Sequence, residues 1–136
     1  MNRNDLYATE TDKTPAAFAK DFQMVCNKYD FIVNNSETMD MAKTFTAHGA
    51  EVGPDFDLHM IQVCKPSKAG KSLTANPERS ILMPKFVMAF SKGGRTQIRY
   101  MSYGEADIRA MVDDDVFPGS LAETFAKIRA MIDEAS

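Results

Sequence analysis

The chain has 136 residues, of which 44% are hydrophobic and 26% charged, and its net charge is −3. These values are typical of one soluble globular domain over residues 1–136. The lack of a basic excess argues against a nucleic-acid partner, and no apolar run approaches the roughly 20 residues that a membrane span requires. Residues 1–4 are predicted to be disordered. The polar N-terminus lacks the apolar segment of a secretory signal, and two cysteines are too few for a disulfide framework, so we expect a cytoplasmic protein.

The first part of the chain predicts a strand, a helix and a second strand. Asp5–Glu10 can form a short first strand. The stretch TPAAFAKDFQMVCNKY is typical of a helix, because Thr14 can cap it, Pro15 suits its first position and apolar residues follow at helical spacing. Phe31–Asn34 is rich in aromatic and β-branched residues, which favours a second strand.

A second helix and an interior strand are predicted next. The helix would begin after Ser36, a typical cap, and end at Gly49. Gly53-Pro54 marks a loop. Leu58–Cys64 is apolar on both faces when read with the period of a strand, which indicates a strand in the interior of a sheet.

A helix and a β-hairpin follow this strand. Pro66 suits the first position of the helix, and Asn76-Pro77 would end it. Ile81–Phe90 reads as a strand, and Thr96–Tyr103 reads as its return strand. Because Gly93-Gly94 lies between them, a hairpin with a tight turn is predicted.

Two helices are predicted to complete the chain, Glu105–Val112 and one that starts at Ser120 with Glu123 in a capping box. The acidic run at 113–115 lacks the glycine and glutamate of a calcium loop and is predicted to be a solvated turn. The order β-α-β-α-β-α-β-β-α-α is typical of the α+β class, with helices packed on a mixed β-sheet in a compact single domain. An exposed sheet face or edge strand would allow a homodimer, the commonest oligomer.

The stretch QVCKPSKAGKS, residues 62–72, supports several interpretations. Its GKS tail is similar to a phosphate-binding loop, but Lys65 replaces the first glycine and Pro66 lacks an amide N–H, which argues against an NTPase. A solvated basic helix face, with weak anion binding at the helix start, is a simpler interpretation. Cys64 precedes a helix N-terminus and three lysines, which favours a thiolate, whereas a packed and unreactive side chain is the alternative.

The sequence gives little support for a metal or haem site. His48 and His59 are the only imidazoles, and neither has a second histidine or cysteine at metal-ligand spacing. Most methionines fall on helix stripes or in strands, where methionine fills gaps. Cys26 borders an apolar helix stripe and is predicted to be structural. We therefore expect no metal and no cofactor, with haem or metal binding as a remote alternative.

The motif VCKPSKA joins a strand that ends in cysteine to an alanine-bearing helix, and NPERSILMPKFVMAF and a return strand follow. In these features the stretch from Leu58 to Ser102 resembles an uncharacterised bacterial and archaeal family, domain of unknown function 302. The resemblance implies a compact α+β domain that tends to self-associate. That family usually has asparagine where this chain has Lys65, and often cysteine where it has Lys85, so any thiol role here would fall on Cys64 alone.

These observations favour one function and leave two alternatives open. We expect a non-catalytic, homo-oligomeric binding protein for a small anionic or amphipathic ligand, held near the end of the predicted strand and the start of the next helix. The predicted ligand site comprises Cys64, Lys65, Ser67, Lys68, Pro84 and Lys85. The alternative is a thiol-dependent enzyme or redox sensor that uses Cys64, so whether the protein is an enzyme stays open.

Overall fold

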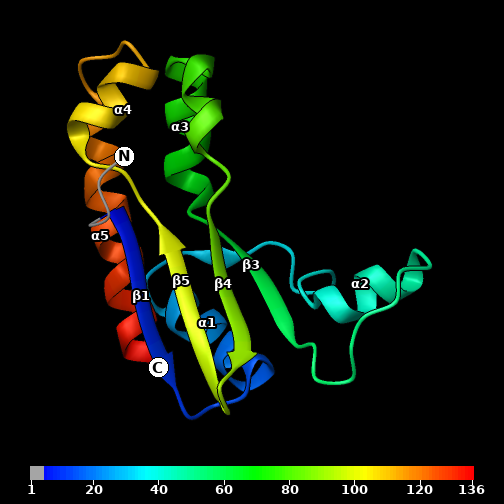
Figure 1. Cartoon of the computed structure of the whole chain (residues 1–136). Helices are drawn as coiled ribbons and strands as arrows, with labels where there is room; N and C mark the ends of the chain where they lie inside the picture. The colour runs from blue at the N-terminus through cyan, green and yellow to red at the C-terminus, as the bar shows by residue number, and fades with distance from the viewer. Residues whose placement is uncertain (1–4) are drawn as a thin grey trace.

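A computed structural model describes residues 5–136, so the predicted disorder of residues 1–4 lies outside the described residues. The strands are β1 (Leu6–Thr11), β2 (Ile32–Val33), β3 (Leu58–Cys64), β4 (Phe86–Lys92) and β5 (Arg95–Met101). The helices are α1 (Pro15–Lys28), α2 (Met41–Ala47), α3 (Pro66–Ala75), α4 (Glu105–Met111) and α5 (Phe117–Ala135), with a 3-10 helix η2 (Pro77–Leu82) after α3. The strands form one sheet in the order β1-β5-β4-β3-β2 (Figure 1).

The predicted α+β class and element order are confirmed, but the prediction of a mixed sheet is wrong. Every pairing between the described strands is antiparallel. Strand–helix–strand segments often join neighbouring parallel strands. Here α1 instead crosses the back of the sheet, from β1 at one edge to β2 at the other, so the two strands that it connects are not neighbours.

The hairpin between β4 and β5 is confirmed. Lys92 pairs with Arg95, which leaves Gly93 and Gly94 as a two-residue turn. Their φ angles are +65° and +77°. A turn with positive φ at both central residues matches the twist of the flanking strands, and glycine adopts this conformation without strain.

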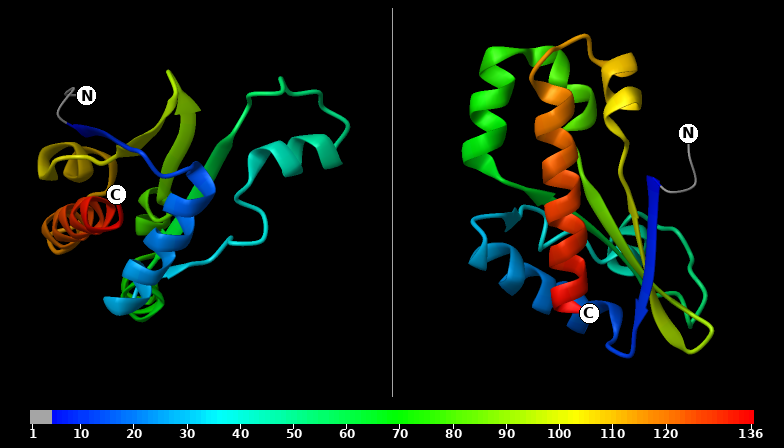
Figure 2. Two further views of the ribbon diagram at one scale, coloured as in Figure 1. Left: turned by 90° about the horizontal axis from the view of Figure 1, so that it is seen from below. Right: turned by 90° about the vertical axis from the view of Figure 1, so that its left-hand side faces the viewer.

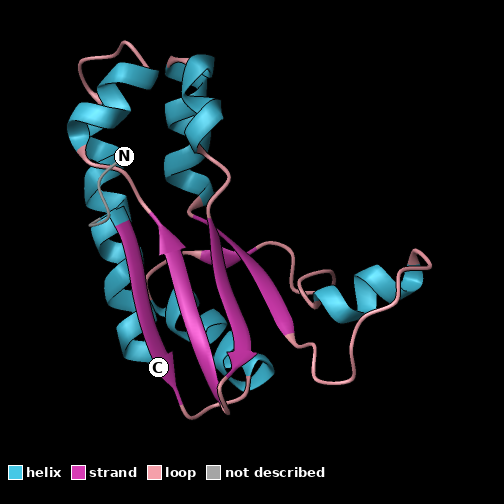
Figure 3. Cartoon of the chain, in the orientation of Figure 1, coloured by secondary structure: helices cyan, strands magenta, loops and turns pink. Residues whose placement is uncertain are grey.

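The hydrophobic core lies between one face of the sheet and the helices α1 and α5 (Figure 2). In β3 the side chains alternate, so that His59, Ile61 and Val63 are buried and their neighbours are only partly covered. The buried side chains contributed by the two helices include Phe18, Phe22, Phe125, Ile128 and Ile132. The opposite face of the sheet has no helix of residues 5–136 packed over it (Figure 3).

Helix α2 begins later than predicted, at Met41, and Asp40 caps it instead of Ser36. The Asp40 carboxylate accepts hydrogen bonds from the amides of Ala42 and Lys43. The preceding residues are not helical because they run along the edge of β3. There the Asn35 side chain accepts from the amide of Gln62 and donates to the carbonyl of Met60.

Two boundaries later in the chain also differ from the prediction. Ile81 and Leu82 belong to η2, so the strand starts at Phe86 and not at Ile81. Helix α5 starts at Phe117 and not at Ser120, because the Asp114 carboxylate accepts hydrogen bonds from the amides of Val116 and Phe117. Asp114 therefore holds the segment that leads into α5, and its side chain is bonded within the protein instead of being solvated.

Candidate functional site

The junction between β3 and α3 has the predicted geometry. Cys64 ends β3 and pairs with Ile32 in β2, and Pro66 occupies the first turn of α3. Lys65 lies between them as the N-cap and makes no side-chain capping hydrogen bond. Its ammonium group lies 5.3 Å from the centroid of the Phe31 ring. Because β3 ends at Cys64 and α3 begins at Pro66, Lys65 lies at the junction between them, at the edge of the core.

A small hollow of ≈ 30 Å³ lies between α3, α5 and the segment that precedes β4. Lys65, Lys68 and Lys85 all line this hollow, which we call the lysine hollow. The rest of its wall is formed by Ala69, Ser72, Met83, Phe117, Ser120, Leu121 and Thr124. Because one water needs about 10–15 Å³ of such space, the hollow has room for a water or a small inorganic ion.

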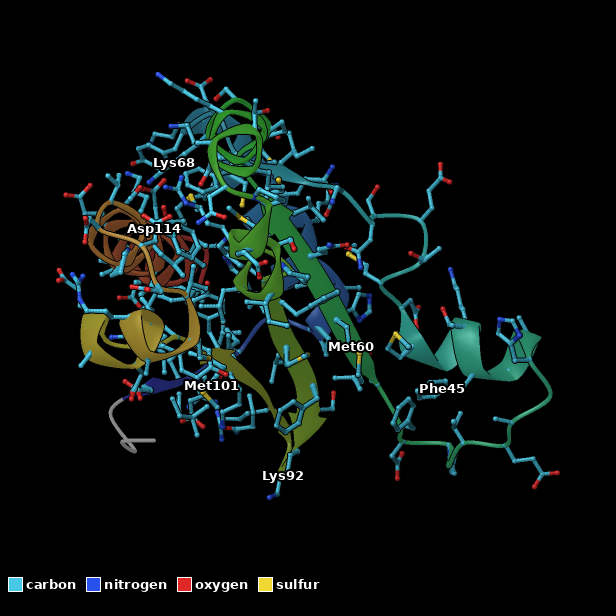
Figure 4. The ribbon with its side chains drawn as sticks, turned by 90° about the horizontal axis from the view of Figure 1, so that it is seen from above. Phe45, Met60, Lys68, Lys92, Met101 and Asp114 are labelled. Carbon is cyan, nitrogen blue, oxygen red and sulfur yellow. The ribbon has the colours of Figure 1, made fainter. Side chains whose placement is uncertain are left out.

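Hydrogen bonds hold two of the three ammonium groups in place. Lys68 Nζ lies 2.7 Å from Thr124 Oγ1 and 3.1 Å from the carbonyl oxygen of Ser120. Figure 4 labels Lys68 between α3 and α5. Lys85 Nζ donates to the carbonyl oxygen of Met83 at 3.2 Å. An ammonium group has three donors, so both lysines keep donors for a further acceptor.

Burial lowers the pKa of Lys85 below the ordinary lysine value. A negative charge on Cys64 would act in the opposite direction, and the ammonium group of Lys68 lowers the pKa further. Both lowering effects arise because a cation loses solvation in a partly apolar wall and meets a like charge there. A bound anion would offset both effects.

The three lysines lack a neutralising carboxylate within the described chain. None of the ion pairs found in residues 5–136 includes Lys65, Lys68 or Lys85. Charge-assisted hydrogen bonds to an anion would satisfy the free donors and reduce the repulsion between the ammonium groups.

An open cleft of ≈ 460 Å³ adjoins the lysine hollow. The two share Lys65, Lys68 and Thr124, and the cleft adds Lys28 and Lys127. Glu123 and Asp30 also line the cleft, so its charge is mixed. The cleft can therefore accommodate a part of a ligand that is too large for the hollow.

The structure brings together only some of the predicted site residues. Lys65, Lys68 and Lys85 line the lysine hollow, whereas Cys64 is not part of its wall but is close enough to influence Lys85. Ser67 and Pro84 are exposed and are not part of its wall. Pro84 lines a different hollow, which it shares with Lys85 and with Phe125 of α5.

The contribution of α5 to the site was not predicted. Phe117, Ser120, Leu121 and Thr124 come from its first two turns. The spacing of Leu121 and Thr124 places both on one helix face. That pattern alone could have shown that Thr124 lies beside the apolar stripe of α5. It could not have shown the contact between Thr124 and Lys68.

A polar cluster behind the hollow fixes the position of η2 relative to α5. Arg79 Nε donates to the Asp114 carboxylate at 2.7 Å, and Asn76 Nδ2 donates to the same oxygen at 2.9 Å. Arg79 also donates to the carbonyl and hydroxyl oxygens of Ser72, which lines the hollow. The cluster therefore links α3, η2 and the start of α5.

The two cysteines differ in burial, and so do the two histidines. Both cysteines are free thiols; Cys26 is buried and Cys64 is half-buried. Burial raises the pKa of Cys26 to about 12, which makes that thiol unreactive. His48 is exposed at the end of α2, whereas His59 is buried in β3. Residues 5–136 contain no group of three or more His, Cys, Asp or Glu side chains that could hold a metal ion.

The fold and the site define a small α+β domain with helices on one side of an antiparallel sheet and a lysine-lined hollow at one end. The chain belongs to the family described as Domain of unknown function DUF302, whose model matches residues 7–135. None of the helices within residues 5–136 has the length and apolar character needed to cross a membrane.

A solved structure shares this fold. The chain is similar to an uncharacterized conserved protein, DUF302, from Bacillus stearothermophilus, with a TM-score of 0.78 and 15% sequence identity. The similarity covers 97% of this chain and 98% of that chain. At this identity the likeness shows the fold alone. No curated protein matches the sequence.

Proposed function

We propose that the protein binds a small anion in the lysine hollow and acts as a homo-oligomeric, non-catalytic binding protein. The observation that carries this proposal is the convergence of Lys65, Lys68 and Lys85 on one hollow without an ion-pair partner in residues 5–136. The uncapped start of α3 adds a weaker attraction for negative charge.

The size of the hollow narrows the ligand class. At ≈ 30 Å³ it suits an inorganic oxyanion or a single carboxylate or phosphate group, and not the apolar body of an amphipathic molecule. A larger ligand would place its anionic group in the hollow and the remainder in the adjoining cleft of ≈ 460 Å³. Lys68 and Lys85 would donate to the anion, and Lys65 would add charge at the rim.

Calorimetric titration with inorganic phosphate tests this function. Lys68→Met and Lys85→Met are each expected to weaken binding about tenfold or more, because a hydrogen bond to a charged group contributes about 1.5–3 kcal/mol. Lys71→Met is the matched control, since Lys71 is exposed on the same helix and does not line the hollow. Equal losses in all three variants, or no binding by the unmodified protein to phosphate, sulfate or acetate, would refute the proposal.

The proximity of Cys64 to Lys85 supports a second candidate, a redox sensor or thiol-dependent enzyme. An ammonium group beside a thiol stabilises its thiolate form. Alkylation with iodoacetamide across a pH series, followed by mass spectrometry, tests this candidate. Fast reaction of Cys64 at neutral pH that slows in Lys85→Met would support it, whereas a rate unchanged by that substitution would contradict it; buried Cys26 is the internal control.

A further inference from the structure

The open cleft beside the lysine hollow continues the basic wall of that hollow. Lys65, Lys68 and Thr124 line both cavities, so the two meet along these side chains. The cleft adds Lys127 of α5 and Tyr29, the last residue of the turn that ends α1. Lys127 follows Thr124 by three residues, which places both on one face of α5. The helix face that anchors Lys68 in the hollow therefore also presents a lysine to the cleft.

The ammonium group of Lys127 is held in place by an aromatic ring. Its Nζ atom lies 3.4 Å from the centroid of the Tyr29 ring. The Tyr29 hydroxyl donates to the Glu134 carboxylate at 2.7 Å, which fixes the ring. Glu134 attracts Lys127 without forming an ion pair with it, and the same carboxylate is bonded to Lys28 at 3.0 Å. A contact with a ring face positions a cation and leaves its charge in place, so Lys127 can still attract an anion.

The cations of the joined cavities outnumber the acids beside them. Four half-buried lysines that belong to none of the ion pairs found in residues 5–136 line the hollow, the cleft or both: Lys65, Lys68, Lys85 and Lys127. Asp30 and Glu123 line the cleft, and both are exposed. Exposed carboxylates keep their hydration, whereas half-buried ammonium groups have lost part of theirs. The joined site therefore favours more negative charge than a single ion supplies.

We propose that the ligand of this site is a chain of linked phosphate groups, with its terminal group in the hollow and the next group in the cleft that Lys65 and Lys127 line. This deepens the proposed function and rests on its anion site. The hollow of ≈ 30 Å³ admits one group, and the cleft of ≈ 460 Å³ has room for the others. Every group of such a chain is negatively charged and offers several acceptor oxygens, and lysine binds phosphate as a point charge. The linkage makes the second contact intramolecular, which raises the affinity above that of separate ions.

Calorimetric titration with orthophosphate, pyrophosphate and tripolyphosphate tests the proposal. The measurements use the unmodified protein at one ionic strength and without divalent cations, so that screening is the same for each anion. Pyrophosphate and tripolyphosphate are expected to bind at least about tenfold more tightly than orthophosphate, with one molecule per chain. Equal affinity for all three anions would overturn this inference and leave the anion site in the hollow standing. Absence of binding for every anion, single or linked, would refute the anion site itself.

Substitution of Lys127 separates the cleft from the hollow. Lys127→Met is expected to weaken tripolyphosphate binding about tenfold and to leave orthophosphate binding unchanged, whereas Lys85→Met should weaken both. Lys20→Met is the matched control, because it removes the same charge from an exposed position on α1 that lines neither cavity. Circular dichroism verifies the fold of each variant, and Lys127→Gln replaces Lys127→Met should the latter not fold. Equal losses for the two anions in Lys127→Met, or an equal loss of tripolyphosphate binding in Lys20→Met, would show general charge attraction and overturn the inference.

A further titration distinguishes two sources of the same phosphate chain. A nucleoside triphosphate such as ATP carries the chain on an organic group, and tripolyphosphate carries the chain alone. If ATP binds no more tightly than tripolyphosphate, the protein recognises the chain itself and the ligand is an inorganic oligophosphate. If ATP binds more tightly and Lys127→Met weakens both ligands alike, the ligand is a nucleotide held by its phosphate groups. ATP binding that is tight but insensitive to both Lys127→Met and Lys85→Met would place the nucleotide elsewhere and contradict the inference.

Discussion

The Nζ atom of Lys68 lies 2.7 Å from the Oγ1 atom of Thr124, and this contact joins α3 to α5 across the lysine hollow. The same ammonium group donates to the carbonyl oxygen of Ser120, one helical turn before Thr124. Two of its three donors are therefore fixed by α5, and the third is left for a ligand. A long flexible side chain is in this way held in position before an anion arrives.

Replacing Thr124 by valine removes one of these acceptors while it keeps the shape of the side chain. We expect Thr124→Val to lower the free energy of unfolding by about 1 kcal/mol and to weaken phosphate binding, because Lys68 loses its anchor. Thr74→Val is the control: the Thr74 hydroxyl also donates to a carbonyl four residues earlier in a helix, but none of the hydrogen bonds found in residues 5–136 joins it to a lysine. Urea denaturation and calorimetry measure the two effects. Equal effects in both variants would contradict the anchoring role.

Anion binding is expected to depend on pH through Lys85. Burial lowers the pKa of Lys85, so its positive charge is lost on the way to high pH earlier than that of an ordinary lysine. The affinity for phosphate or sulfate should therefore fall as the pH rises through the lowered pKa of Lys85. At pH values below that pKa, Lys85 is already protonated, so anion binding should take up few protons. Lys85→Arg keeps its charge at all these pH values, and its affinity should stay flat over the same range. A parallel decline in both proteins, measured by calorimetry, would exclude Lys85 as the cause.

Local sequence signals predicted much of the fold. Pro66 at the start of α3 and Gly93-Gly94 in the hairpin act within their own segments, so their positions could be interpreted without tertiary contacts. The start of α2 could not, because the Asn35 side chain hydrogen bonds to β3 and the residues after it form a turn along that strand instead of a helix. Whether the strands of a sheet run parallel or antiparallel likewise depends on which strands become neighbours. The helices that connect the strands do not by themselves determine which strands are neighbours.

The site was predictable only where its residues are close in sequence. Lys65 and Lys68 flank the start of one helix, and the family resemblance drew attention to the position of Lys85. Thr124 lies 56 residues from Lys68, and no local pattern connects the two. Asp114 was interpreted as solvated because a run of three aspartates usually is. Its bonds to Arg79 and to the amides at the start of α5 depend on packing between distant segments.

Asp114 is expected to contribute stability that depends on its negative charge. The hydrogen bond from Arg79, followed by those from the Phe117 amide and Asn76, holds the pKa of Asp114 well below its usual range. A depressed pKa in the folded state means that the contribution is complete above the unfolded value of about 4 and declines as the pH falls below it. Asp114→Asn should thus be clearly destabilised at pH 7, and the difference from the unmodified protein should shrink at pH 3.

Urea denaturation at the two pH values measures this difference. Asp113→Asn is the control, because Asp113 is an exposed neighbour in the same acidic run, and it is expected to change the free energy of unfolding little at either pH. A penalty for Asp114→Asn that is the same at pH 3 and pH 7 would show that the shape of the side chain, and not its charge, caps α5.

Tyr100 offers a substitution that is expected to stabilise the protein. Its side chain is 1% exposed, and its hydroxyl has no hydrogen-bond partner within residues 5–136. Burial raises the pKa of Tyr100 far above its usual value, as expected for a hydroxyl in an apolar setting. Tyr100→Phe removes this unsatisfied group and keeps the edge-on contact with Phe125, so the free energy of unfolding should rise by about 1 kcal/mol.

Tyr103→Phe is the control, because Tyr103 is half-buried and also meets Phe125 edge-on. This substitution should change the free energy of unfolding little. A loss of stability in Tyr100→Phe, measured by urea denaturation, would show that water or a shifted side chain bonds the hydroxyl in solution.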